Sequence, residues 1–329
     1  ILDYLSFMVT SVVASCCIRK VDVIVATSPQ FFTACAGYLV SILKRAPWIF
    51  ELRDIWPESI KAVGAMEESL FIRFIEGLEL FLYRKASRIV SVTNAFKNSL
   101  GERGVDTKKI DVITNGVDAT RFSPLPKDQD LLSDLELHGK FIAGYIGTHG
   151  LAHGLDTILE AAHCEQTSCP DSHLHFLLLG DGAEKARLKA RASELNLSNM
   201  TFVDSVSKAE VVRYWSILDV SIVHLKKTSL FEAVIPSKIF ECMGMGIPIA
   251  HGVNGESADI VEAFDVGMLF EPESSEGLLE VLHRFASDGD LHNEIGQRGQ
   301  HSAKSFDRAM LAANMLEILR DVHAFVQKD

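Results

Sequence analysis

A lysine and a glutamate three positions apart form the sharpest chemical signal in the chain. The stretch IPSKIFECMGMGIPIA (235–250) places Pro236 where it suits the first turn of a helix, and two glycines mark the helix end. Lys238 and Glu241 therefore share one helix face. Because the helix is short and leads directly into an apolar strand, we expect both charges at the ligand edge of a sheet. There Lys238 could hold a diphosphate and Glu241 could accept hydrogen bonds from ribose hydroxyls; the alternative is a surface ion pair of little energetic value.

A glycine-rich turn is the second signal. In GYIGTHGLAHGLDT (144–157), glycines bracket a predicted transition from strand to helix. Backbone N–H groups at such a helix start can face an anion, and glycine lets the anion approach closely. The alternative is that the glycines serve only tight packing of helix on sheet. His149 and His153, within this turn, are expected to face solvent.

A second turn has the same character. LLLGDGAEKARL (177–188) reads as a strand that ends in Gly180, Asp181 and Gly182 before an amphipathic helix. Ligands of open α/β sheets bind at the carboxyl ends of strands, so this turn also favours a binding site. A turn that merely needs positive φ is the alternative interpretation.

The elements that position these residues alternate between strand and helix. One series runs through strands at 21–28, 46–54, 87–93 and 109–116, and a second begins at 140–147 and continues to about residue 272. Such alternation predicts parallel sheets covered by helices on both faces, which is an α/β fold of two Rossmann-like, doubly wound domains. We expect a first domain at 1–123, a linker at 124–139 and a second domain at 140–304. The C-terminal helix, 305–329, is expected to pack back on the first domain.

Composition narrows the class of protein. The chain has 329 residues, 47% of them hydrophobic, and a net charge of −12, which argues against a nucleic-acid partner. Residues 1–90 nevertheless carry ten Lys and Arg against nine Asp and Glu, so this third is relatively basic. The six cysteines show no CxxC pairing, which favours a reducing compartment.

The apolar opening run, 1–18, predicts a buried or interfacial helix rather than a signal peptide.

The motifs together resemble one enzyme family. PSKIFECMGMGIPI, GTHGLAHGLDTILEAA, LLLGDGAEKARL and GESADIVE are similar to the donor domain of retaining glycosyltransferases of family 4 (group 1). FELRDIWPESI, VTNAFKN and ITNGVDATRFSP resemble a bacterial branch that builds surface polysaccharide, including transferases of fucosamine and other N-acetylamino sugars. The resemblance is collinear over nearly the whole chain and implies the GT-B fold, with the two domains facing a cleft.

The resemblance also implies roles for residues of the second domain. Glu241 would bind the nucleotide ribose, and the diphosphate would be held by residues of the helix start and the two glycine turns: Ser237, Lys238, Gly147, Thr148, Gly180 and Gly182. Two departures stand out. The family commonly has paired glutamates eight apart, yet Ala233 stands eight before Glu241, with Glu232 one step off register. The basic pair often found in the first turn is replaced by Thr148 and His153, so Lys238, with help from Lys226 or Lys227, would be the main cation for the leaving group.

The acceptor side is predicted in the first domain. ELRDIWPES clusters Glu51, Arg53, Asp54 and Glu58 at the carboxyl end of a predicted strand. We expect Asp54 to orient or deprotonate the acceptor and Arg53 to contact an acceptor phosphate. Asp54 would alternatively cap the segment that follows.

The resemblance further implies that a first strand and glycine-rich turn are missing before Ile1, so that the first domain is incomplete and the chain N-terminally truncated. The predicted activity is retaining transfer of a hexose or N-acetylamino sugar from a nucleotide sugar, UDP-sugar favoured, to a saccharide that is lipid-linked, in polysaccharide, O-antigen or capsule biosynthesis. No cofactor and no metal are expected. The expected location is cytoplasmic, peripheral at the inner face of the membrane. A nucleotide-sugar 2-epimerase of the same fold and an inactive nucleotide-sugar-binding relic are the alternatives.

Overall fold

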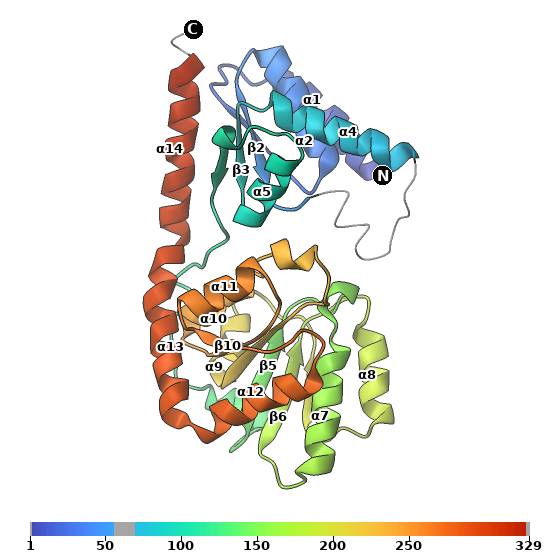
Figure 1. Ribbon diagram of the computed structural model, residues 1–329, viewed down its shortest axis with the longest axis vertical. Coiled ribbons are helices and arrows are strands. Elements are labelled where there is room, and N and C mark those ends of the chain that lie inside the picture. The colour runs from blue at the N-terminus through green and yellow to red at the C-terminus, as the bar shows by residue number, and fades with distance from the viewer. Residues whose placement is uncertain (1, 56–69, 327–329) are drawn as a thin grey trace. The chain divides into compact units, whose positions relative to one another are not determined.

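The computed structural model describes residues 2–55 and 70–326, which divide into two compact units (Figure 1). Unit 1 comprises Ile1–Thr114 and Ala309–Asp329, and unit 2 comprises Asn115–Arg308. Each unit is built on a sheet whose described strands all run parallel, with helices against it. The predicted α/β class and the pair of parallel-sheet domains are confirmed.

The described residues of unit 1 form a four-stranded sheet in the order β1-β2-β3-β4. Its strands are β1 (Ile24–Thr27), β2 (Trp48–Leu52), β3 (Arg88–Ser91) and β4 (Ile110–Val112). Its helices are α1 (Leu2–Cys16), α2 (Phe31–Lys44), α4 (Leu70–Lys85), α5 (Asn94–Glu102) and α14 (Arg308–Val326), which joins the unit from Ala309. The ammonium of Lys109 donates to three carbonyls at the end of α4, where helix carbonyls lack partners in the helix. Val322 of α14 lies in one buried cluster with Ile49 and Val90, so α14 contributes to the core of this unit.

Helix α1 packs on α2 along one side only. Leu5, Met8 and Val12 are half-buried and Ser15 is its one buried residue, whereas Phe7 and Val13 are 53% and 63% exposed. A helix that is apolar all round normally buries its whole surface. The opening run is therefore a surface helix with an apolar outer side, and not the buried helix that was one of its two predicted forms.

Unit 2 contains a six-stranded sheet in the order β10-β9-β8-β5-β6-β7. Its strands are β5 (Phe141–Ile146), β6 (Leu174–Leu179), β7 (Met200–Val203), β8 (Val220–His224), β9 (Ile249–Gly252) and β10 (Gly267–Leu269). Its helices are α6 (Gln129–Asp134), α7 (Asp156–Ser168), α8 (Lys185–Glu194), α9 (Val211–Ile217), α10 (Lys238–Met245), α11 (Glu256–Ala263), α12 (Ser275–Ser287) and α13 (Gly289–Ala303). The chain moves outward from β5 through β6 to β7 and then returns to β8 on the other side, so the strand order reverses between β5 and β8.

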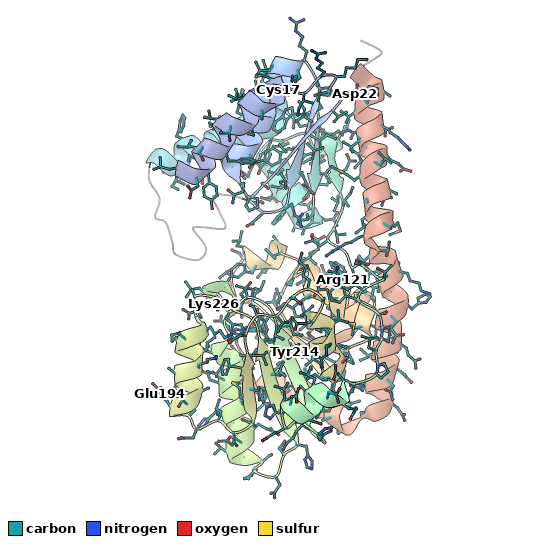
Figure 2. All side chains as sticks on the ribbon, turned by 180° about the vertical axis from the view of Figure 1, so that it is seen from behind. Cys17, Asp22, Arg121, Glu194, Tyr214 and Lys226 are labelled. Atoms are coloured by element: carbon teal, nitrogen blue, oxygen red, sulfur yellow. The ribbon has the colours of Figure 1, made fainter. Side chains whose placement is uncertain are left out.

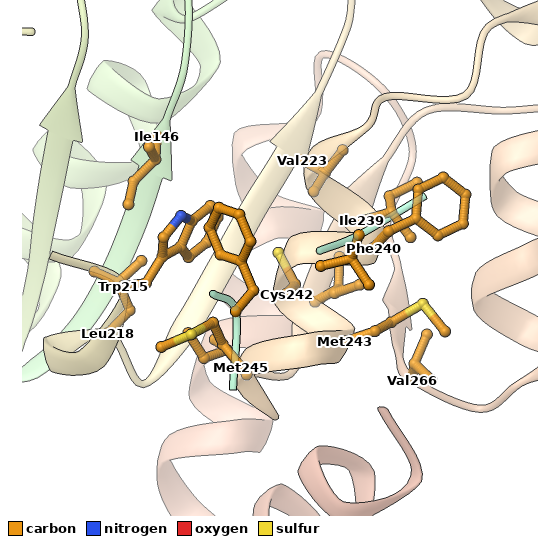
Figure 3. Close-up of a cluster of buried hydrophobic side chains, with 14 of the residues drawn as sticks. Ile146, Trp215, Leu218, Val223, Ile239, Phe240, Cys242, Met243, Met245 and Val266 are labelled. Atoms are coloured by element: carbon orange, nitrogen blue, oxygen red, sulfur yellow. The ribbon is translucent and has the colours of Figure 1, made fainter. Parts of the chain in front are cut away.

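Alternate residues of β5 enter two different core layers. Ile142 and Ile146 pack with α9, α10 and α11, while Ala143 and Tyr145 pack with α7, α8 and α12. Figure 3 shows part of the first layer, in which Trp215 and Phe240 lie among methionine and aliphatic side chains. Both faces of the sheet are therefore covered, as the apolar strand sequences require.

The boundary of unit 2 differs from the predicted one. Residues 124–139 were expected to be a linker because they are rich in proline and aspartate, yet Leu131 and Leu132 of α6 are buried in the core of unit 2. Burial of this leucine pair incorporates the segment into the unit. The two ends of unit 2 are joined by backbone hydrogen bonds, from Val117 N to Phe306 O (2.9 Å) and from Arg308 N to Val117 O (3.0 Å).

No helix in the described parts of the chain is long and apolar enough to cross a membrane.

Replacement of Phe240 by alanine tests whether the core layer under α10 supports the fold. Phe240 is 0% exposed and its ring lies 4.6 Å from that of Phe306. We expect the variant to lose about 3–5 kcal/mol of unfolding free energy, because it loses both apolar burial and packing contacts. Urea unfolding followed by circular dichroism measures this; the control Leu125→Ala, at a half-exposed site, should change stability by less than about 0.5 kcal/mol.

Candidate functional site

The carboxyl edge of the unit 2 sheet gathers most of the residues predicted to hold the donor. Gly147 follows β5, Gly180 follows β6, and Lys238 begins α10, the helix between β8 and β9. A Cβ atom at Gly147 would lie 2.8 Å from the Lys238 Nζ atom, so the glycine turn and the helix start meet. They meet between β5 and β8, the point where ligands bind in doubly wound sheets. Figure 2 shows Lys226, just beyond β8, on this edge, and Glu194 away from it at the end of α8.

The ammonium group of Lys238 is buried although the residue as a whole is only half-buried. Nζ lies 3.6 Å from the centroid of the Tyr145 ring and has no hydrogen-bond partner among the described residues. Burial lowers the pKa of Lys238 to about 8, against the opposing influence of Cys242 and Glu241. No ion pair with Glu241 forms within the part of the chain that the structure describes, so the surface-pair interpretation of these two residues is wrong.

Ser237 and Thr148 lie beside Lys238 with exposed side chains. Ser237 immediately precedes α10, and its hydroxyl does not cap the helix. Thr148 follows Gly147, and its carbonyl accepts a hydrogen bond of 2.9 Å from the hydroxyl of Tyr145. Ser237 lies at the start of α10 and Thr148 in the turn after β5, where the sequence predicted them. Their contact with a ligand stays a prediction.

Glu241 lies one helical turn beyond Lys238 and is half-buried. Burial raises the pKa of its carboxyl, while the charges of Lys238 and Arg308 act in the opposite direction. Glu232, the off-register glutamate, is exposed in a short 3₁₀ turn, Phe231–Ala233. Its carbonyl oxygen would lie 2.1 Å from a Cβ at Gly255, so the position of this turn depends on a glycine before α11.

Gly180 and Gly182 are explained by the packing of the two turns against each other. A Cβ at Gly180 would lie 1.8 Å from the carbonyl oxygen of Gly147, and one at Gly182 would lie 2.4 Å from the carbonyl oxygen of His149. The turns are also joined by a hydrogen bond of 2.8 Å from His149 N to Asp181 O. The packing alternative thus accounts for both glycines, and their contact with a diphosphate remains a prediction.

His149 does not face solvent as predicted. Its side chain is fully buried, and neither ring nitrogen has a hydrogen-bond partner among the described residues. Burial, with the nearby charges of Lys185 and Lys238, lowers the pKa of His149 to about 4. His153 is also largely buried, and its pKa is lowered to about 4 for the same reason. Both rings are therefore neutral at pH 7.

Two neighbouring residues, Lys185 and His224, have roles that sequence patterns did not reveal, and a third, Lys227, has a different partner from the predicted one. Lys185 is buried, and its ammonium donates to Gly180 O (2.6 Å), Val203 O (3.1 Å) and Asp204 Oδ1 (2.5 Å). His224 accepts a hydrogen bond from Glu273 N through Nε2 and donates through Nδ1 to His153 O (2.7 Å). Lys227 pairs with Glu271 at the surface, so Lys227 is engaged elsewhere and Lys226 is the remaining candidate helper.

The acceptor-side residues lie at the carboxyl edge of the unit 1 sheet, directly after β2. Arg53 is exposed and Asp54 is half-buried. The buried hydroxyl of Ser28, at the end of β1, accepts from Arg53 N (3.1 Å) and donates to Asp54 O (3.1 Å). Ser28 was missed because a serine after a strand is common and nothing in the sequence indicates its bridging role. Glu51 belongs to β2, and Glu58 lies outside the described residues.

The described residues contain no group of three or more His, Cys, Asp and Glu side chains that could hold a metal ion. Independence from metal stays a prediction.

Solved structures share the fold. The crystal structure of Anabaena Alr3699/HepE in complex with UDP and glucose matches with a TM-score of 0.79 at 20% identity, covering 96% of this chain and 81% of that one. WaaG, a glycosyltransferase involved in lipopolysaccharide biosynthesis, matches with a TM-score of 0.68 at 14% identity, covering 88% and 83%. Two parallel-sheet units of this kind form the GT-B fold, as predicted.

Sequence comparison identifies the family. The model of the glycosyl transferases group 1 family matches residues 129–302, and that of Glycosyltransferase Family 4 matches residues 6–121. The chain belongs to the group 1 glycosyltransferases.

Individual relatives share about a quarter of their aligned residues with this chain. The chain is 26% identical over 310 residues to the putative colanic acid biosynthesis glycosyl transferase WcaI of Escherichia coli K12, covering 92% of this chain and 74% of that protein. It is 27% identical over 222 residues to the Escherichia coli UDP-Gal:alpha-D-GlcNAc-diphosphoundecaprenol alpha-1,3-galactosyltransferase, covering 65% of this chain and 55% of that protein.

The close approach of the two turns is tested by Gly180→Ala. We expect a lowered melting temperature and weaker nucleotide binding, because the new methyl group would displace the Gly147 backbone from Lys238. The matched control is Gly289→Ala, at a helix start where a Cβ meets no atom within 4 Å; it should leave the melting temperature unchanged or slightly raised. Equal losses in both variants would contradict this account of the turns.

Proposed function

We propose that the chain transfers a hexose or N-acetylamino sugar from a nucleoside-diphosphate sugar, UDP-sugar favoured, to a lipid-linked saccharide, with retention, in surface-polysaccharide biosynthesis. The observation that carries the proposal is the buried Lys238 ammonium beside Gly147, with no hydrogen-bond partner among the described residues. A buried charge of this kind is costly unless it meets an opposite charge. A diphosphate supplies that charge and accepts the hydrogen bonds that the ammonium has available.

The proposed roles follow from position. Lys238 and the positive end of the α10 helix dipole would stabilise the negative charge that grows on the departing diphosphate, beside Ser237 and the Gly147–Thr148 turn. Glu241, one turn further along α10, would accept hydrogen bonds from the ribose. Arg53 and Asp54, held at the edge of the unit 1 sheet, would contact the acceptor, Arg53 through a phosphate and Asp54 through the attacking hydroxyl.

The comparisons support the chemical class of donor and acceptor. The HepE structure contains UDP and glucose, and the name of the galactosyltransferase relative specifies UDP-Gal and a diphosphoundecaprenol-linked acceptor. UDP, UDP-Gal and the diphosphoundecaprenol-linked acceptor each carry a diphosphate, the group that the Lys238 site suits.

Isothermal titration with UDP and with GDP tests the donor site. We expect one nucleotide to bind, and Glu241→Ala and Lys238→Met each to weaken it about tenfold or more, a loss of about 1.4 kcal/mol. Glu160→Ala, at an exposed position on α7, is the control and should bind like the wild type. If a folded wild-type sample binds neither nucleotide, the donor-site proposal is wrong.

Product analysis separates the proposed reaction from its alternatives. With a diphosphate-linked saccharide present, transfer releases nucleoside diphosphate. Epimerisation would leave the mass of the nucleotide sugar unchanged, and binding without any product would identify an inactive binding protein.

We propose that an anionic membrane surface binds unit 1. Helix α2 packs against both α1 and α4, and these three helices expose Phe7, Ile42 and Phe74, of which Phe74 is 68% exposed. Basic residues lie at the ends of α2 and α4: Lys44, Arg45, Arg84 and Lys85. Apolar side chains flanked by cations are the combination that binds the interface of anionic bilayers.

Vesicle co-sedimentation tests this surface. We expect binding to vesicles containing phosphatidylglycerol and much less to purely zwitterionic vesicles. Phe74→Ser should weaken binding about tenfold, because a fully buried Phe contributes about 1.5–3 kcal/mol. The control Leu125→Ser, an exposed position in unit 2, should bind normally; an equal loss in the two variants would contradict the proposal.

A further inference from the structure

Tyr145 contacts both parts of the candidate donor site. Its side chain is fully buried at the end of β5. The ring centroid lies 3.6 Å from Lys238 Nζ, and the hydroxyl donates to Thr148 O at 2.9 Å. One residue thus links the start of α10 to the turn after β5, two segments that lie 90 positions apart in the sequence.

The Tyr145 ring stabilises the Lys238 ammonium without accepting conventional hydrogen bonds from its three N–H groups. A lysine carries three N–H donors on a flexible stem of four carbons. A carboxylate partner would fix the stem but would also occupy donors and neutralise the charge. An aromatic face attracts the cation through its quadrupole instead, and leaves the donors unpaired.

The surroundings are consistent with a site that is prepared for an anion. The Lys238 ammonium lies against the backbone of Gly147, where a Cβ would come within 2.8 Å of Nζ. His149, buried nearby, is neutral because its pKa is lowered to about 4. The described part of the chain offers no hydrogen-bond acceptor for Nζ, so its donors remain for a ligand.

We propose that Tyr145 is a positioning residue for the nucleoside-diphosphate site: its ring holds the Lys238 ammonium ready for the diphosphate, and its hydroxyl fixes the backbone of the Gly147–Thr148 turn. The inference rests on the proposed function, since the ligand of this site is the nucleoside-diphosphate sugar that the proposed reaction consumes.

The experiment measures UDP affinity by calorimetry between pH 7.5 and pH 10, or GDP affinity if that nucleotide is the one that binds; the matching nucleoside serves as control. Wild-type affinity should fall as pH rises through about 8, because the pKa of Lys238 is lowered to about 8 by burial and the neutral amine attracts phosphate poorly. Lys238→Arg should abolish this fall, since arginine keeps its charge. Affinity for the nucleoside should not follow the same curve.

Other groups that face Lys238 do not produce this curve. From the turn after β5, His149 and His153 have their pKa lowered to about 4, and on β8 the pKa of His224 is also lowered. On α10 itself, burial raises the pKa of Cys242 to about 12. Burial also raises the pKa of Tyr145, and Glu241 is retained in every variant compared. Phosphate groups are fully ionised above pH 7.5.

Two variants test the ring and the hydroxyl of Tyr145 separately. Tyr145→Leu removes the ring, so the charged ammonium loses support; we expect at least tenfold weaker nucleotide binding at pH 7.5 and a fall in affinity that begins at lower pH. Tyr145→Phe keeps the ring and loses the bond to Thr148, so it should bind a few-fold more weakly with an unchanged pH midpoint. Wild-type affinity and midpoint in a folded Tyr145→Leu protein would overturn the inference while leaving the donor site intact.

A measurement on the wild-type chain covers the case in which Tyr145→Leu does not fold. In protein labelled with ¹³C at lysine Cε, the resonance assigned to Lys238 by its loss in Lys238→Arg should be shifted upfield by the ring and should move on addition of UDP. A Lys238 resonance at the ordinary lysine position overturns the inference. If no UDP or GDP binds to the wild type, the proposed function fails and this inference fails with it.

Discussion

A buried, charged ammonium is the constraint around which unit 2 is arranged. Placing the Lys238 charge out of water is costly, and the ring of Tyr145 offsets only part of that cost. The arrangement persists because rigid elements hold it: α10 is fixed by Phe240 and Met243 in the core, and Tyr145 by its place in a central strand. Gly147 has no Cβ, which at this position would lie only 2.8 Å from the ammonium nitrogen.

The histidines around this ammonium shape its electrostatics by remaining neutral. His149 and His153 have lost solvent, and the nearby positive charge of Lys238 disfavours their protonation further. The turn at 147–154 contains no lysine or arginine, so little positive charge comes from that turn. At the proposed donor site, one lysine and the dipole of α10 would then supply most of the attraction for a phosphate.

Sequence patterns predicted the larger features because these depend on local rules. Alternating apolar strands and amphipathic helices specify a parallel sheet, and the position of Lys238 after Pro236 placed its charge near the ligand edge. Residues whose role depends on distant partners escaped prediction. The burial of His149 results from the packing of two turns, Lys185 is buried only because three acceptors converge on it, and Tyr145 reads as an ordinary strand residue. The burial of the α6 leucines was not predicted, because the prolines that precede them indicated a linker.

The hydrogen-bonded ends of unit 2 make that unit an insertion within unit 1. The chain enters at Val117 and leaves at Arg308 through neighbouring backbone positions, so the inserted segment closes on itself and adds little loop entropy to the folding of unit 1. Unit 1, by contrast, needs segments from both sides of unit 2, because Val322 completes a cluster with Ile49 and Val90. During synthesis, the cluster around Ile49 and Val90 is therefore completed only after α14 has left the ribosome, while unit 2 has all of its own residues earlier.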